Sequence, residues 1–172
     1  YFNIETQSDD AAFLYPFKHV AQPDLKLPMQ LYEISMMYYV AGLRWALSPY
    51  AYHTIGSTIS CSLDRYAAVR GFPKRNTGED FYLLNKLRKT GEVRMADGDP
   101  IIISGRISDR VPIGTGQAIR AIHGLDSPSS EFTLEHSGCF SQLKRFLEWL
   151  NDISVTQPGE PSTGDPYIDD YV

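Results

Sequence analysis

The chain has 172 residues, 42% of them hydrophobic and 12% aromatic, which is enough for one globular core and too little for two comfortable ones. Its formal charge of -5 at pH 7 gives no general attraction to a phosphate backbone, so a nucleic-acid partner is not expected. The two cysteines and four histidines are scattered without metal-ligand spacing, and no apolar run reaches the roughly 20 residues of a membrane span. We therefore expect a reduced, cytoplasmic protein without structural zinc.

The first part of the chain combines a short strand with a long apolar helix. Residues 11–15 have the pattern of a strand, which Pro16 ends, and Pro23 and Pro28 bracket a predicted loop. Residues 31–47 then predict a helix that is apolar around most of its circumference. Burial in the core is the favoured interpretation of this helix. The alternative is a surface for a partner domain or a membrane, which would place the protein peripherally at the inner membrane face.

The rest of the chain alternates between strand and helix patterns. We predict strands at residues 54–62, 93–95 and 101–104, the last two on either side of a turn at 97–100, and helices at residues 63–69, 79–89, 114–122 and 140–150. This alternation predicts an α/β fold, a short mixed sheet flanked by helices. Residues 1–155 are the predicted globular part, and residues 156–172 are an acidic, Pro/Gly-rich tail that is predicted to be disordered.

A pair of acids, Glu79 and Asp80, opens one of these helices. Thr77 lies three residues before Asp80, which is the spacing of a capping box, so the helix is expected to begin near Gly78. Asp80 shares one helix face with three leucines, Leu83, Leu84 and Leu87, and therefore points toward the core side. Glu79 lies about 100° away around the helix. In this position Asp80 either caps its own helix or is held toward a cavity as a catalytic base.

The surroundings of the acid pair resemble a known family. A strand of small residues beginning at Gly56, a short helix ended by Gly71-Phe72-Pro73 and the pair Glu79-Asp80 follow one another in this order. Over about residues 50–119 the pattern resembles the acceptor half of bacterial, inverting family 2 glycosyltransferases of GT-A type, with Arg70 in place of the first glycine of a Gly-Gly-Phe motif. The resemblance implies a partial GT-A-like fold, a nucleotide-sugar donor and a hydroxyl acceptor. It also makes Asp80 the general base.

A second group of candidate residues follows in residues 106–116. Arg106 and Arg110 supply fixed positive charge, while Gly114 and Gly116 allow close backbone approach at a helix start, which suits the diphosphate of a nucleotide-sugar. The alternative is a surface loop in which Asp109 pairs with one of the arginines. The predicted substrate-binding residues are, in all, His53, Gly56, Glu79, Arg106, Arg110, Gly114 and Gly116.

No metal ligands are predicted in this chain. GT-A enzymes usually hold Mn²⁺ or Mg²⁺ with an Asp-x-Asp motif before the acceptor half, whereas Asp9 and Asp10 are adjacent and Asp97-Gly98-Asp99 comes after the acid pair and is better explained as a turn. We therefore expect the nucleotide-binding half, and with it the metal site, upstream in a longer protein, and we expect this fragment to be inactive alone.

Two other functions compete with glycosyl transfer. The chain could be a non-catalytic binding module or an inactive, truncated relative of the glycosyltransferases, with Asp80 only a helix cap. A glycoside hydrolase would need two carboxylates about 5–10 Å apart across a sugar. The adjacent Glu79 and Asp80 point in different directions, which argues against that function.

Overall fold

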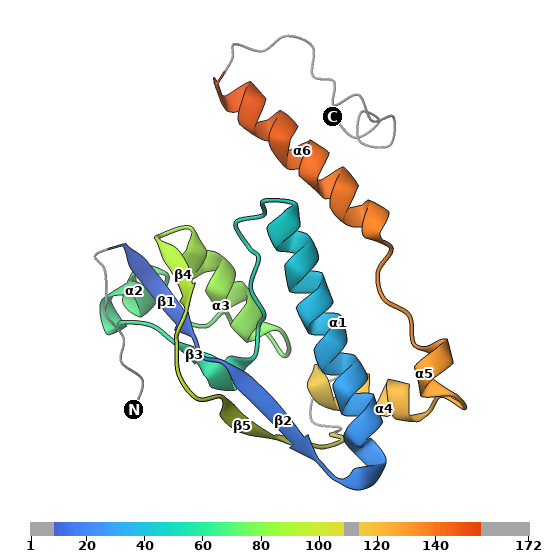
Figure 1. The fold of residues 1–172 in the computed structure, drawn as a ribbon. Coiled ribbons are helices and arrows are strands. Elements are labelled where there is room, and N and C mark those ends of the chain that lie inside the picture. Colours follow the sequence, from blue (N-terminus) through green and yellow to red (C-terminus); the bar gives the residue numbers. More distant parts are fainter. Residues whose placement is uncertain (1–8, 109–113, 156–172) are drawn as a thin grey trace. The chain divides into compact units, whose positions relative to one another are not determined.

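A computed structural model describes residues 9–108 and 114–155 of the chain (Figure 1). The chain divides into two compact units. The first contains the residues up to 34 together with residues 53–132, and the second contains residues 35–52 together with the residues from 133 onward. All described candidate site residues belong to the first unit. The predicted extent of the globular part, residues 1–155, stays a prediction, and the predicted acidic tail lies outside the described residues.

The first unit contains two small sheets, which confirm the predicted α/β class. Strand β1 (Asp10–Leu14) pairs antiparallel with β3 (Ile59–Ser60) and parallel with β4 (Glu92–Met95). Strand β2 (Phe17–Ala21) pairs parallel with β5 (Ile101–Gly105). Figure 1 shows β2 continuing the direction of the chain from β1, with β5 beside it.

The strands predicted at 93–95 and 101–104 are present on either side of the predicted turn, and a third predicted strand is shorter than expected. Strands β4 and β5 belong to different sheets, since β4 pairs with β1 and β5 pairs with β2. The strand predicted over residues 54–62 is reduced to Ile59–Ser60, because a 3-10 helix at Gly56–Thr58 precedes it. The backbone N–H and the hydroxyl of Thr58 both donate to the carbonyl of Ile55, at 2.9 Å each, and these bonds turn the chain out of the extended conformation.

The predicted helices are present, with shifted ends. Helices α2 (Leu63–Ala68), α3 (Glu79–Arg88) and α4 (Thr115–His123) lie where the sequence predicts them. Helix α1 (Lys26–Trp45) begins earlier than predicted and follows a 3-10 helix at Pro23–Leu25. Pro28 is therefore in the first turn of α1 and not in a loop. A proline is tolerated there because the first N–H groups of a helix have no partner within it.

Helix α3 is fixed to the three-stranded sheet by its apolar face. It packs on β1 and β4 (Figure 1). The predicted stripe of Leu83, Leu84 and Leu87 is buried, with at most 2% of each residue exposed, and Leu14 of β1 is fully buried as well. Burial of each leucine stabilises the fold by roughly 1.5–3 kcal/mol. The first turn of α3 is therefore held in a defined position at the edge of this core.

The second unit consists of the end of α1 and helix α6 (Ser137–Val155), which starts earlier and ends later than the predicted helix. A short helix, α5 (Pro128–Glu131), which the sequence did not predict, belongs to the first unit. Phe140 of α6 packs directly on Gly42 of α1, where an added Cβ would lie 2.4 Å from the ring. None of the described helices combines the length and the apolar character needed to cross a bilayer.

Candidate active site

The acid pair lies in the first turn of α3, but the helix begins differently from the prediction. Gly78, with φ 70° and ψ 18°, is the N-cap residue and makes no side-chain cap hydrogen bond. The predicted capping box from Thr77 to Asp80 is therefore wrong. The left-handed conformation at residue 78 is one that glycine adopts without steric cost, and it turns the chain into the helix one residue later than a threonine cap would. Glu79 and Asp80 are thus the first two helical residues.

The carboxylate of Asp80 lies between its own helix and the backbone of Gly56. Its Oδ1 accepts a hydrogen bond from the Phe81 backbone N–H at 2.8 Å. Its Oδ2 would lie 3.1 Å from a Cβ added to Gly56, so a glycine leaves the room that this carboxylate occupies. Asp80 is half-buried and Gly56 is exposed. The structure therefore brings together two predicted site residues, 24 positions apart in the sequence, at a place that solvent can reach.

The segment before α3 is shaped by two consecutive residues with positive φ. Arg70 has φ 58° and Gly71 has φ 60°. Gly71 is packed against Tyr66, whose ring would lie 2.6 Å from an added Cβ, and its carbonyl accepts a hydrogen bond from Lys86 Nζ at 2.9 Å. Residue 70 is the position at which the Gly-Gly-Phe motif has its first glycine. A non-glycine residue in this conformation costs of order 1–3 kcal/mol, so the backbone here has the form that a glycine pair would favour.

The predicted diphosphate-binding residues lie around the start of α4. Gly114 is the N-cap residue, with φ 129°, and Gly116 approaches Ser108 so closely that an added Cβ would lie 2.7 Å from the serine Cβ. Gln117 Nε2 donates to the Ser108 carbonyl at 3.3 Å, which fastens the end of the preceding loop to the helix. Arg106 is exposed at the beginning of that loop. Arg110 and its predicted alternative partner Asp109 lie outside the described residues.

The remaining candidates are Glu79 and His53. Glu79 is exposed. His53 is half-buried, and its ring packs edge-on against Phe17 of β2, with the centroids 4.7 Å apart. These two residues stay predicted substrate neighbours on the strength of their place in the sequence alone.

Comparison with protein-family models, with curated proteins and with solved structures gives no match to this chain. The resemblance to family 2 glycosyltransferases therefore rests on the sequence motifs alone.

The described residues offer no ligand set for the Mn²⁺ or Mg²⁺ that the family resemblance implies. Within residues 9–108 and 114–155, no group of three or more histidine, cysteine, aspartate or glutamate side chains is arranged to hold a metal ion. Asp97 and Asp99 are exposed in the turn between β4 and β5. The described residues therefore do not fit a metal site.

A polar pair formed by buried His19 of β2 and half-buried Glu33 of α1 was not predicted. His19 is 7% exposed, and Glu33 Oε1 accepts hydrogen bonds from both its backbone N–H at 2.8 Å and its Nδ1 at 2.9 Å. Next to Glu33, Tyr32 receives a hydrogen bond from the hydroxyl of Thr115 in α4, at 3.3 Å. The pattern of β2, in which exposed Lys18 and Val20 flank His19, already indicates that His19 points inward. Its partner lies 14 residues away, and no local pattern identifies it.

Proposed function

We propose that this chain supplies the acceptor side and the catalytic base of an inverting glycosyltransferase of the family 2, GT-A type. The observation that carries the proposal is the position of the Asp80 carboxylate. One oxygen is tied to the Phe81 N–H, and the other faces the side-chain-free surface of Gly56. A carboxylate held in one orientation and open to solvent has the form required of a general base.

The proposed reaction is a single displacement. The acceptor hydroxyl gives its proton to Asp80 Oδ2 while its oxygen forms a bond to the anomeric carbon of the donor sugar. The bond from that carbon to the nucleoside diphosphate breaks on the opposite face, and the electron pair leaves with the diphosphate. Proton transfer to a positioned base contributes roughly 10²–10⁴-fold to the rate.

The loop and helix start around α4 are the proposed contact for the leaving group. Arg106 and Arg110 supply positive charge, and Gly114 and Gly116 allow the diphosphate to approach the first N–H groups of α4. The sugar nucleotide itself is expected to be held by a nucleotide-binding half, which also carries the Mn²⁺ or Mg²⁺ site. That cation would stabilise the charge of the diphosphate.

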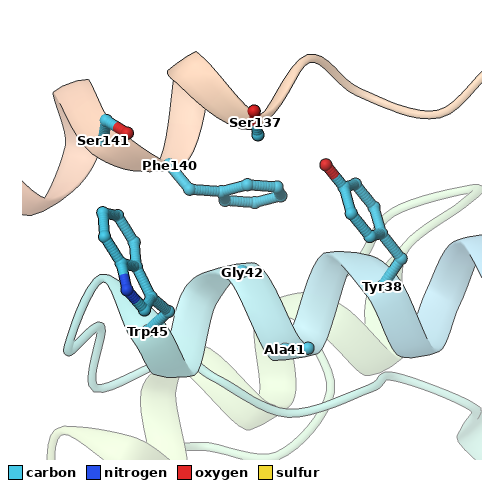
Figure 2. Close-up of a pocket in the computed structure, with 7 residues that line it drawn as sticks. All are labelled: Tyr38, Ala41, Gly42, Trp45, Ser137, Phe140 and Ser141. Atoms are coloured by element: carbon cyan, nitrogen blue, oxygen red, sulfur yellow. The ribbon is translucent and has the colours of Figure 1, made fainter.

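The competing proposal is a non-catalytic module in which Asp80 only stabilises its helix. The bond from the Phe81 N–H to Asp80 Oδ1 favours it, because an acid in a first helical turn commonly satisfies such a donor. An apolar cavity of about 280 Å³ between α1 and α6 gives such a module a surface for a partner (Figure 2).

A matched pair of variants separates the two proposals. In the full-length enzyme, Asp80→Asn should lower the turnover of transfer by about 10²–10⁴-fold and leave donor binding unchanged. Asp64→Asn is the control. Asp64 is an exposed acid in the first turn of α2, so this substitution removes the same charge from a helix start. Transfer would be measured with a panel of nucleotide-sugars, with Mn²⁺ and with Mg²⁺. Equal turnover in the two variants would refute the assignment of Asp80 as the base.

A further inference from the structure

A group of cationic and aromatic side chains lies in the segment that leads into the helix of the proposed base. We call it the basic–aromatic cluster; it consists of Arg70, Phe72, Lys74, Arg75, Phe81 and Tyr82. Its members come from the loop between α2 and α3 and from the first turn of α3. Phe81 follows Asp80 in the chain, and its N–H binds the Asp80 carboxylate. The cluster and the base therefore share one short segment of backbone.

The aromatic members of the cluster are exposed, although they are large. Phe72 is 49% exposed, Phe81 47% and Tyr82 38%. Phe81 and Tyr82 are in edge contact, with centroids 5.4 Å apart, and Phe72 contacts Tyr66 at 5.9 Å. Flat apolar rings that keep defined positions while facing water are typical of binding surfaces.

The cationic members leave this surface positively charged. Residues 70–78 contain Arg70, Lys74 and Arg75 and no acid, in a chain whose net charge is -5. All three side chains are exposed, and no ion pair within the described part of the chain involves any of them. The acids next in the chain are Glu79 and Asp80. Positive charge is thus concentrated in the segment that precedes the proposed base and is not neutralised by a described ion pair.

Arg75 has a defined place in the cluster. Its guanidinium lies over the Tyr82 ring, 3.8 Å from the centroid. Stacking on an aromatic face holds a guanidinium in place by its flat side and leaves its N–H edge available. Such an edge binds a carboxylate or a phosphate through two parallel hydrogen bonds. A preorganised fork next to exposed rings suits a ligand that is both a sugar and an anion.

We propose that the acceptor of this enzyme is an anionic carbohydrate, whose carboxylate or phosphate is bound by Arg75 and Lys74 while its ring lies on the exposed aromatic side chains. This inference rests on the proposed function, since it identifies the class of molecule whose hydroxyl Asp80 deprotonates. The diphosphate of the donor has its own proposed contacts at the start of α4. The basic–aromatic cluster is therefore assigned to the acceptor.

Binding of matched sugars to the protein tests the charge preference. Methyl β-D-glucuronide and methyl β-D-glucoside differ only at C6, which is a carboxylate in the first and a hydroxymethyl group in the second. Glucose 6-phosphate tests binding of a phosphate in place of the carboxylate. Titration followed by amide chemical shifts should show at least one of the two anionic sugars binding about 10-fold or more tightly than the neutral glucoside. That preference should shrink as salt is raised from 50 to 500 mM. Equal binding of the three sugars overturns the proposal.

Variants identify the residues that produce the preference. Arg75→Gln and Lys74→Gln should each reduce binding of the anionic sugar by about 10-fold and leave binding of the glucoside unchanged. Arg44→Gln and Lys89→Gln are the controls, since each removes one exposed cation that lies outside the cluster. If Arg75→Gln leaves the anionic sugar unaffected, the proposal is wrong. If it instead weakens binding of UDP, the cluster belongs to the donor and the proposal is equally wrong.

These outcomes are distinct from those for the catalytic base. A preference for anionic sugars that depends on Arg75, together with full transfer by Asp80→Asn, would retain the cluster as a sugar site and refute the base. If Asp80→Asn loses transfer but the protein binds the neutral sugar as tightly as the anionic sugars or more tightly, the base is retained and the anionic acceptor is refuted.

Discussion

The contact between Gly56 and Asp80 gives the sharpest test of the site, because a single added methyl group probes it. In Gly56→Ala the new Cβ would lie 3.1 Å from Asp80 Oδ2, closer than an ordinary carbon–oxygen contact, while the Asp80 Cβ and Cγ are at 3.4 and 3.7 Å. The carboxylate must therefore move by a few tenths of an ångström. Residue 56 is not in the left-handed region, so the substitution adds no backbone strain of that kind.

The expected effects on stability and on activity differ. Filling a tight space destabilises, whereas replacing glycine by alanine stabilises by about 0.4–1 kcal/mol through the unfolded state. The free energy of unfolding should thus change by less than about 1 kcal/mol. Displacing a catalytic group by 1 Å costs about 10²-fold in rate, so a shift of a few tenths of an ångström should lower turnover by roughly 10-fold.

Two measurements follow the displacement. Turnover of the full-length enzyme reports its effect on transfer, and the amide chemical shift of Phe81 reports the carboxylate directly, because this N–H donates to Asp80. Gly124→Ala is the control, since its added Cβ meets Arg120 O at 3.4 Å, an ordinary contact. If the Phe81 amide shifts while turnover stays at the wild-type value, the position of Asp80 has no bearing on catalysis and the reasoning fails.

Three further predictions concern the rest of the molecule. Gly42→Ala should destabilise the protein by about 1–3 kcal/mol in urea unfolding, because the added Cβ would overlap the Phe140 ring. The double variant Gly42→Ala with Phe140→Leu should recover part of this loss. Glu33→Ala should cost about 1–3 kcal/mol in the same assay, since it removes the acceptor of two His19 hydrogen bonds, and Glu33→Gln, which keeps the acceptor oxygen, should cost less. Burial raises the pKa of the Cys61 thiol, so iodoacetamide should alkylate Cys61 more slowly at pH 8 than it alkylates free cysteine, and a faster reaction would contradict the burial.

Helix periodicity was the most successful source of structural prediction. The spacing of Leu83, Leu84 and Leu87 depends only on the 3.6-residue turn, and the same three side chains are buried against the sheet. The start of that helix was less predictable. The capping box predicts a helix start near Gly78, whereas the left-handed Gly78 places the start at Glu79. The backbone conformation that decides between the two is not visible in the residue types.

Long-range pairing accounts for most of the differences from the predicted fold. Strand β2 was not predicted, because Pro16 interrupts the pattern and its partner β5 begins 84 residues after it. The separation of β4 and β5 into two sheets has the same origin, since each strand takes a partner from the N-terminal segment. Likewise, neither Arg75 nor Tyr82 was singled out from the sequence, and their stacking appears only once the loop before α3 is folded.

The hypotheses that Asp80 caps its helix and that it acts as a base turn out to use different atoms. Oδ1 accepts the Phe81 N–H, as a residue in a first helical turn commonly does, and this bond restricts rotation of the carboxylate. Oδ2 is thereby directed toward Gly56, where the missing side chain keeps a path to solvent. In the proposed mechanism, capping is the means by which the second oxygen is positioned for proton transfer. A larger residue 56 would displace this oxygen whatever its role, whereas a loss of turnover on that displacement is expected only of a base.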